Sequence, residues 1–364
     1  MSSEPSPTFA FEPSASRVAD DARALMLVDP GFGRVFTDHM AIAQYDEGVG
    51  WHDAKITARH TLTMDPAASV LHYAQEIFEG LKAYSRPNGG AALFRPDANA
   101  RRFNASARRM AMPDLPEEMF LDSVRSLVRT EKAWIPPRED GALYLRPFMF
   151  ASEVFLGVKP AARYLYIVMA SSVGSYFKGA PSISLWVTRE YTRAAPGGTG
   201  AAKCGGNYAT SLIAQAEATR NGCDQVVFLD AVERRWVEEL GGMNIFFVFD
   251  DGSLATPPLS GTILAGITRD SIITLARDMG LTVREEPYSI EQWQADSESG
   301  RLTEAFACGT AAVVTAIGSV KGAEGGFAIG GQSVGPVTQR IRETLVAIQR
   351  GQAPDPHNWI EEIA

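Results

Sequence analysis

One lysine, Lys203, stands in the glycine-rich segment 196–217, which reads PGGTGAAKCGGNYATSLIAQAE. Glycines on both sides let the backbone turn tightly and come close to a ligand. A lysine held there can bind a phosphate as a cation or act as an amine nucleophile. Ala202 and Cys204 occupy the places where a Walker phosphate loop needs Gly and Ser or Thr, so that loop is excluded. A Schiff base with a carbonyl cofactor such as pyridoxal phosphate and a solvated surface lysine both stay open.

Two adjacent acids, Glu238 and Glu239, could act on such a cofactor. We expect one to face the cofactor and the other to face solvent, because successive side chains of an extended segment point to opposite faces. A carboxylate beside a pyridine nitrogen keeps that nitrogen protonated and makes the ring a stronger electron sink. The alternative is an acidic pair at the surface. Tyr208 could hydrogen-bond the ring oxygen of a cofactor, or be a buried structural tyrosine.

Three further groups could bind anions. Residues 266–268 (Gly-Ile-Thr) open a predicted helix whose first N–H groups could hold an anion, unless Thr268 is an ordinary N-cap. Residues 309–311 (Gly-Thr-Ala) form a turn of small residues after a predicted strand, suited to a phosphate or a carboxylate, or only to tight packing. Arg102 lies on a basic helix and could reach a phosphate, although such helix faces are usually solvated.

The composition bounds the class of protein. The chain has 364 residues, of which 45% are hydrophobic and 21% are charged, so two domains with large cores are expected. The net charge of -9 argues against nucleic acid or acidic lipid as a main partner. No apolar run reaches membrane-spanning length, and the N-terminus lacks the features of a secretory signal. Three dispersed cysteines form no CxxC pattern and indicate a reducing cytoplasm, and we expect no bound metal.

The elements that must position these residues mix strands and helices without a regular βαβ rhythm. This pattern predicts a mixed α/β fold rather than a doubly wound sheet. Apolar or alternating runs predict strands at 34–45, 51–63, 81–84, 91–95, 141–153, 163–169, 183–188, 225–229, 237–240, 244–249, 281–285, 303–307 and 313–317. Helical periodicity and caps predict helices at 67–78, 97–112, 116–128, 209–221, 268–279, 290–300 and 336–349. A hairpin turn is predicted at 87–90 (PNGG).

Four stretches divide the chain by composition and pattern. We expect a partly flexible Ser/Pro-rich tail over 1–30, a small N-terminal domain over 31–170, an interdomain loop over 171–182 and a large C-terminal domain over 183–364 that carries Lys203.

Eight segments occur in the order of one known family. They are VFTDHM at 35–40, HYAQEIFEGLKAY at 72–84, LFRPDANARRF at 93–103, ALYLRP at 142–147, KCGGNYATSLIAQAEA at 203–218, EELGGMNIF at 238–246, LSGTILAGITR at 259–269 and CGTAA at 308–312. The chain therefore resembles the branched-chain amino-acid aminotransferases, which belong to the fold type IV enzymes that use pyridoxal phosphate. This resemblance implies a small N-terminal α/β domain and a larger C-terminal α/β domain like a pseudo-barrel.

The resemblance also implies roles for individual residues. Lys203 resembles the Schiff-base lysine and catalytic base, and Glu239, rather than Glu238, resembles the partner of the pyridine nitrogen. The other matching positions bind the cofactor (Arg102, Tyr208, Ile267, Thr268, Thr310) or the substrate (Phe36, Tyr73, Phe78, Tyr144, Arg146, Tyr176, Thr310, Ala311). Among them, Arg146 matches the arginine used for glutamate, Tyr176 lies in the interdomain loop, and the turn at 310–311 matches the α-carboxylate site.

The function implied by the resemblance is ping-pong transfer of the amino group of leucine, isoleucine or valine to 2-oxoglutarate. The products are a branched-chain 2-oxo acid and L-glutamate, and the family implies a homodimer. A D-amino-acid aminotransferase, an aminodeoxychorismate lyase and a non-catalytic cofactor-binding protein are the alternatives. Mammalian members carry a CxxC thiol pair where this chain has Ala312 and Thr315, so we expect that redox switch to be absent.

Overall fold

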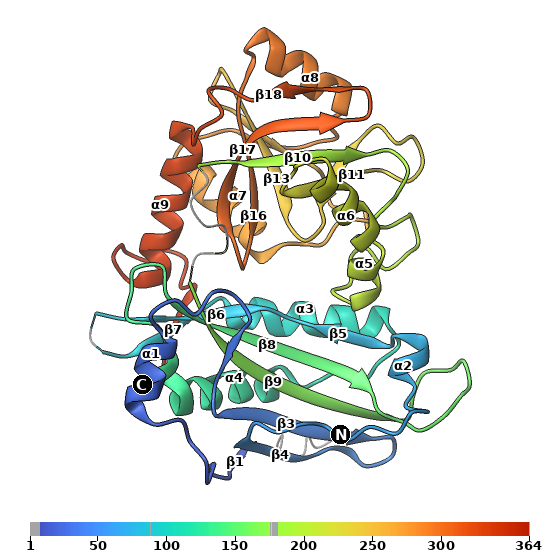
Figure 1. Ribbon diagram of the computed structural model, residues 1–364, viewed down its shortest axis with the longest axis vertical. Coiled ribbons are helices and arrows are strands. Elements are labelled where there is room, and N and C mark those ends of the chain that lie inside the picture. Colours follow the sequence, from blue (N-terminus) through green and yellow to red (C-terminus); the bar gives the residue numbers. More distant parts are fainter. Residues whose placement is uncertain (1–7, 88, 175, 177–180, 364) are drawn as a thin grey trace. The chain divides into compact units, whose positions relative to one another are not determined.

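The computed structural model describes residues 8–87, 89–174, 176 and 181–363. The chain forms two compact units, Met1–Tyr176 together with Ile348–Ala364, and Phe177–Ala347. Each unit contains one large sheet, and the two sheets are drawn in Figure 1. We describe each unit by itself.

The first unit is built on a sheet that has ten strands among the described residues. Its main path runs β1-β4-β3-β9-β8-β6-β7-β19, with β2 paired to β9 and β5 paired to β8. The strands are β1 (Ala10–Phe11), β2 (Val35–Phe36), β3 (His39–Asp46), β4 (Gly50–Ala58), β5 (Glu76–Phe78), β6 (Leu81–Ser85), β7 (Ala91–Phe94), β8 (Ala142–Ala151), β9 (Arg163–Val173) and β19 (Ile360–Ile363).

Two helices, α3 (Pro96–Arg109) and α4 (Glu117–Glu131), cover one face of this sheet (Figure 1). Both carry apolar residues three and four positions apart, which places them on one side of a helix. The ring of Tyr166, on β9, lies 5.6 Å from that of Phe103 and 6.4 Å from that of Phe120. The smaller helical elements are α1 (Asp20–Met26), α2 (Val70–Tyr73) and a 3-10 turn, η1 (Lys132–Trp134).

The opposite face of the same sheet carries the polar and aromatic residues that matter below. Tyr144 and Arg146 are two apart on β8 and therefore share a face. Their partners on β9 are Ser171 and Met169, which have the opposite parity to Tyr166 and so lie on the face away from α3 and α4. The first unit thus has one face for its helical core and another available for chemistry.

The second unit is built on a sheet that has nine strands among the described residues. Its main path runs β12-β11-β10-β17-β16-β13-β14-β15, with β18 paired to β17. The strands are β10 (Ile183–Thr188), β11 (Gln225–Leu229), β12 (Val237–Leu240), β13 (Asn244–Phe249), β14 (Leu254–Thr256), β15 (Val283–Glu285), β16 (Leu302–Gly309), β17 (Val313–Gly322) and β18 (Gly325–Ala328). The helices are α5 (Gly205–Ala209), α6 (Leu212–Arg220), α7 (Ile267–Asp278), α8 (Ile290–Ser299) and α9 (Pro336–Arg350), whose last residues belong to the first unit.

This second sheet curls until its two ends meet. An antiparallel bridge joins Trp236, just before β12, to Ser289, beyond β15. Val237 N–H also donates to Tyr288 O at 3.0 Å. Alternate residues such as Leu185, Val227 and Phe247 fill the interior, whereas those between them pack beneath α6. The result matches the pseudo-barrel expected for the larger domain.

Three local expectations differ from the structure. Residues 67–78 were expected to form one helix, but α2 ends at Tyr73, where Ala74 adopts a left-handed φ of 49°, and 76–78 form β5. Pairing with β8 overrides the helical pattern there. The expected tail 1–30 contains β1, paired to β4, and the helix α1, while residues 1–7 lie outside the described residues.

The expected C-terminal domain also differs at its end. Residues 348–364 belong to the first unit, because β19 pairs antiparallel with β7. Asn88 of the expected hairpin turn, and residues 175 and 177–180 of the expected interdomain loop, lie outside the described residues. No helix in the described part of the chain is long and apolar enough to cross a membrane.

Candidate active site

Lys203 is held at the end of a loop that one asparagine fixes. Asn207 Nδ2 donates to the carbonyl oxygens of Thr199 and Ala202, both at 2.8 Å, and Asn207 Oδ1 accepts from Thr199 Oγ1 at 2.7 Å. These bonds tie the glycine-rich loop to the start of α5. Lys203 Nζ then donates to Tyr208 OH at 2.9 Å. The amine and the phenol expected to meet a cofactor are therefore in contact.

Glu239 lies on β12 and is 2% exposed. Arg193 Nη1 lies 2.7 Å from Glu239 Oε1, and the backbone N–H of Leu264 donates to the same oxygen at 3.0 Å. Burial raises the pKa of Glu239 to about 7, against the lowering effects of the Arg193 charge and of the hydrogen bond from Leu264. The result is a buried acid that can exist in both protonation states near neutral pH.

Glu238 does not face solvent, as the alternation along the strand led us to expect for one of the two acids. Glu238 is 8% exposed and accepts a short hydrogen bond from Thr262 Oγ1. The expectation fails because β12 lies within the curled sheet, where both of its faces are covered. Burial also raises the pKa of Glu238.

The start of α7 is attached to this acid by Asn244. Asn244 Nδ2 donates to Leu264 O at 3.1 Å and to Glu239 Oε2 at 3.5 Å. A Cβ built on Gly266 would lie 2.0 Å from Asn244 Oδ1, so only glycine fits there. The helix begins at Ile267 and has no side-chain cap, which leaves its first N–H groups available to an anion.

The turn that contains Thr310 and Ala311 joins β16 to β17. A Cβ built on the preceding Gly309 would lie 3.4 Å from Met243 Cγ and 3.7 Å from Gly242 O. A Cβ built on Gly242 would lie 3.4 Å from Tyr208 Cε1. The structure therefore brings together, within the second unit, the predicted residues Lys203, Tyr208, Glu239, Ile267, Thr268, Thr310 and Ala311.

A second cluster of predicted residues lies in the first unit. Arg146 Nη2 donates to Tyr144 OH at 2.8 Å, and the Arg146 guanidinium stands 4.7 Å from the centre of the Phe78 ring. Arg146 Nε is buried and has no hydrogen-bond partner among the described residues. A guanidinium held against two rings, with a donor to spare, suits the recognition of a carboxylate.

The other predicted substrate residues of the first unit meet this cluster to different degrees. Phe36 and Tyr144 both lie opposite Ser171 in the sheet and so share its face. Tyr176 packs edge-on against Phe32 at 5.0 Å, and Phe32 lies 5.1 Å from the Tyr144 ring. Tyr73, on α2, is 38% exposed, and its one described ring contact is with His72.

Arg102 is paired with a carboxylate that the motif analysis did not single out. Arg102 Nε and Nη2 donate to the two oxygens of Glu79 at 2.7 and 2.8 Å. Glu79 is fully buried and also accepts from Asn99 Nδ2 at 2.7 Å. This bidentate pair fixes the direction of the guanidinium. The phosphate-binding role of Arg102 stays a prediction.

Known proteins share this sequence and fold. The family described as amino-transferase class IV matches residues 76–320. The chain belongs to this family. It is 54% identical to the probable branched-chain-amino-acid aminotransferase of Streptomyces coelicolor, over 98% of this chain and 99% of that relative. It is also 54% identical to the branched-chain-amino-acid aminotransferase of Mycobacterium tuberculosis, over 94% of this chain and 95% of that relative.

Two solved structures show the same architecture. The branched-chain amino-acid aminotransferase of Escherichia coli aligns with a TM-score of 0.75 and 29% identity, over 90% of this chain and 99% of that one. A thermophile's branched-chain amino-acid aminotransferase (T.th.), complexed with N-(5'-phosphopyridoxyl)-L-glutamate, aligns with a TM-score of 0.73 and 28% identity, over 89% and 99%. These similarities confirm the mixed α/β fold of type IV aminotransferases.

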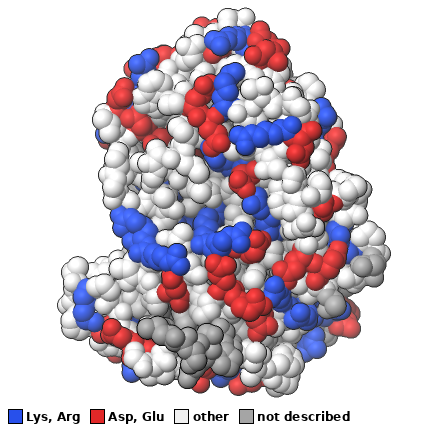
Figure 2. Space-filling model, turned by 180° about the vertical axis from the view of Figure 1, so that it is seen from behind, with Lys and Arg blue, Asp and Glu red and all other residues white. Residues whose placement is uncertain are grey.

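Several site residues of this class IV aminotransferase were not singled out from the sequence. Arg193, Asn207 and Asn244 act through contacts with residues far along the chain, so no local pattern marks them. Phe32 stands between two glycines with positive φ, which is a signal that could have drawn attention to it. Figure 2 shows acidic and basic side chains next to one another over much of the face it draws.

Proposed function

We propose that this class IV aminotransferase binds pyridoxal phosphate and transfers the amino group of leucine, isoleucine or valine to 2-oxoglutarate, giving the branched-chain 2-oxo acid and glutamate. The names of the relatives support this substrate class. The observation that carries the proposal is the hydrogen bond between Lys203 Nζ and Tyr208 OH beside the buried Glu239. Two solved neighbours contain pyridoxamine 5'-phosphate or a phosphopyridoxyl amino acid, which supports the choice of cofactor.

The residues of the second unit fit such a cofactor. When bound, pyridoxal phosphate supplies an aldehyde that condenses with amino groups and a ring that takes up negative charge from Cα. Lys203 offers the amine for attachment and then moves the Cα proton. Tyr208 donates to or accepts from the ring oxygen, and Glu239 accepts a hydrogen bond from the ring nitrogen. The uncapped start of α7, at Ile267 and Thr268, offers N–H groups to the phosphate.

Arg193 supports this chemistry from behind. Its guanidinium contacts Glu239 and also donates to Thr262 O at 3.0 Å, so it holds the acid in place and favours its charged form. A charged Glu239 stabilises a protonated ring nitrogen, and that proton makes the ring a better electron sink. Arg193 is therefore a positioning residue in this proposal.

Recognition of two different side chains is assigned to the first unit. Phe78 and Tyr144 offer apolar ring surface to a branched aliphatic chain. Arg146, which stands over Phe78 and is bonded to Tyr144, offers a cation to the γ-carboxylate of glutamate or 2-oxoglutarate. The turn at 310–311 is proposed to bind the α-carboxylate common to all substrates.

We also infer a cytoplasmic homodimer. The segment after β8 exposes four large apolar side chains, and Val158 is 90% exposed, which favours burial against a second copy (Val154, Phe155, Leu156, Val158). The three cysteines are buried and free, as in proteins of reducing compartments.

The test is a survey of amino donors with the purified, cofactor-loaded enzyme and 2-oxoglutarate. Glutamate should form with L-leucine, L-isoleucine and L-valine and far more slowly with D-alanine or D-leucine. A preference for the D-amino acids would favour the D-amino-acid aminotransferase. An unchanged visible spectrum on addition of leucine, with no glutamate formed, would mean a cofactor-binding protein without turnover.

A further inference from the structure

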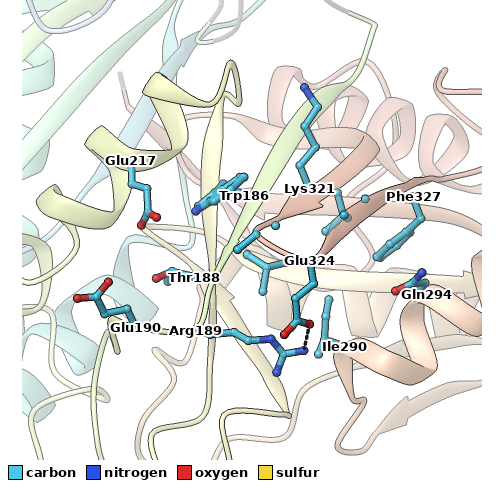
Figure 3. A pocket seen from close by; sticks show the side chains of 16 residues that line it. Trp186, Thr188, Arg189, Glu190, Glu217, Ile290, Gln294, Lys321, Glu324 and Phe327 are labelled. Atoms are coloured by element: carbon cyan, nitrogen blue, oxygen red, sulfur yellow. Dashed lines mark ion pairs between the residues drawn. The ribbon is translucent and has the colours of Figure 1, made fainter.

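A cavity of about 250 Å³ lies in the second unit where the barrel meets α6, α8 and the β17–β18 hairpin (Figure 3). None of the described residues that line it belongs to the candidate active site. Its size suits a ligand smaller than the usual occupants of protein pockets, which fill roughly 300 Å³ or more. It is also too large for one water molecule, whose share of volume is about 30 Å³.

Two polar atoms at this cavity have no hydrogen-bond partner among the described residues. They are Trp186 Nε1, on β10, and Glu217 Oε2, on α6. Trp186 is only 9% exposed, and both atoms are shielded from solvent. In Figure 3 the indole nitrogen of Trp186 points toward Glu217. A buried donor and a buried acceptor left unmade are costly, so each indicates a missing partner.

The charges around the cavity favour a cationic group near Glu217. Arg189 also lines the cavity, but its guanidinium lies 3.2 Å from Glu291 and 3.7 Å from Glu324, which offset its charge. Glu217 has no ion pair among the described residues. A carboxylate in this situation gains most from an ammonium group.

The remaining walls are apolar and polar in a pattern that completes the match. Ile290, Val320 and Phe327 line the cavity with aliphatic and aromatic surface. The indole N–H of Trp186 is a donor only and therefore requires an acceptor on the ligand. A ligand for all three features carries an ammonium group, an acceptor such as a carboxylate, and a short aliphatic chain.

We propose that this cavity is a second binding site, separate from the candidate active site, for a small aliphatic α-amino acid. The ammonium group of the amino acid pairs with Glu217, its carboxylate accepts from the Trp186 indole N–H, and its side chain packs on the apolar wall. The chain holding Trp186 leads within seven residues to Arg193, which contacts Glu239. An amino acid bound here therefore lies along the segment that supports the proposed cofactor acid.

The experiment follows the indole N–H signal of Trp186 by NMR in the ¹⁵N-labelled holoenzyme. The chain has six tryptophans, and the signal is assigned as the one that disappears in Trp186→Phe. L-Leucine, 3-methylbutylamine, which lacks the carboxylate, and 4-methylvalerate, which lacks the ammonium group, are titrated separately. We expect leucine to shift the signal with saturation and 4-methylvalerate to leave it in place. The amine should bind more weakly than leucine, because it offers Trp186 no acceptor.

Two variants separate this site from the candidate active site. Glu217→Gln keeps the shape of the side chain but removes its charge, and should weaken the leucine response at Trp186 by at least about tenfold. Glu233→Gln removes an exposed acid outside the cavity and should leave the response unchanged. Both variants should keep wild-type transamination, which also shows that they are folded. Conversion of the cofactor by leucine then occurs equally in all three proteins, so only a response that depends on Glu217 counts.

Three results would overturn the proposal. The first is a Trp186 signal that does not move with leucine up to its solubility limit, which means that water alone fills the cavity. The second is an equal response in Glu217→Gln and the wild type, which means that the signal reports a distant event. The third is a shift with 4-methylvalerate as large as that with leucine, which rules out pairing of the ammonium group. None of these results bears on the amino-donor survey, so the proposed function is tested separately.

Discussion

Arg193 lies 2.7 Å from Glu239, and each of these side chains is only 3% exposed. The two residues are separated by the whole of α5, α6 and β11, yet they form one buried ion pair. Removal of one partner from such a pair leaves an uncompensated buried charge. The pair therefore makes Glu239 the more sensitive of the two adjacent acids.

Substitution of the two acids should have unequal effects on turnover. Glu239→Gln removes the partner of the ring nitrogen and should lower kcat by about a hundredfold or more. Glu238→Gln should lower it by less than about threefold, because the amide oxygen still accepts from Thr262. Steady-state kinetics with leucine and 2-oxoglutarate measure both. The reverse ranking would mean that Glu238 is the residue that meets the cofactor.

The stability of the apoenzyme should depend on pH through Glu239. Burial raises its pKa from the ordinary 4.5 to about 7 in the folded protein, so the folded state holds a proton that the unfolded state has lost. The contribution of this group is therefore full below about pH 4.5 and declines as pH rises through about 7. Urea unfolding across this range should show a steeper decline for the wild type than for Glu239→Gln. Glu233→Gln, an exposed control, should follow the wild type, and parallel curves for Glu239→Gln would refute the shift.

Lys203 should be the lysine that binds the cofactor aldehyde. Borohydride reduction of the holoenzyme followed by peptide mass spectrometry should locate the phosphopyridoxyl group there and on none of the other six lysines. Lys82 is the informative competitor, because burial lowers its pKa to about 8 and makes it a better nucleophile. Lys203→Ala should lose turnover by at least about a thousandfold. Stoichiometric labelling of Lys82 in the wild type would reject the assignment.

Arg146→Met should affect the two half-reactions differently. The KM for 2-oxoglutarate should rise by roughly 30-fold or more, because its γ-carboxylate would lose its cation. The KM for leucine should change by less than about tenfold, since methionine preserves apolar bulk beside Phe78. Tyr144→Phe is the matched variant, which removes the acceptor of Arg146 but keeps the charge, and it should fall between the two. Equal losses for both substrates would show that Arg146 serves the architecture or the α-carboxylate.

Gly266→Ala should disturb the site by sterics alone. The backbone of Gly266 has φ -67° and ψ 129°, which alanine tolerates, but its Cβ would lie 2.0 Å from Asn244 Oδ1. Displacement of Asn244 should destabilise the apoenzyme by about 1–3 kcal/mol and weaken cofactor binding. The control is Gly206→Ala in α5, where the new Cβ meets nothing within 4 Å and should be neutral or stabilise by up to about 1 kcal/mol. Urea unfolding and titration of the apoenzyme with pyridoxal phosphate measure both effects. Wild-type behaviour of Gly266→Ala would mean that Asn244 has room to move.

The central strands of the second unit could be predicted closely from the sequence. The strands at 225–229, 237–240 and 244–249 have the predicted bounds, because each is a short apolar or β-branched run bounded by turn residues. The segment 67–78 was wrong, because its fate depends on pairing with β8 far along the chain. The two acids show the same limit: alternation predicts which side each one faces, but not that the curled sheet buries both sides.

The site shows a similar division. The contact of Lys203 with Tyr208 links residues close in sequence, and motif spacing was enough to single out both. Arg193 and Asn244 are single polar residues whose partners lie tens of residues away, and nothing in their neighbourhood distinguishes them from surface residues. The catalytic and binding roles themselves stay predictions until the variants above are measured.

The pairing of β19 with β7 has a consequence for synthesis on the ribosome. Strand β7 is translated early, but its neighbour on this edge is among the last segments to be made. Until then β7 presents unpaired N–H and C=O groups that could join another nascent chain. The second unit can fold during this wait, because its strands are contiguous in sequence. Completion of the first sheet should therefore be a late, post-translational step, and chaperones that cover exposed strands should act on that edge.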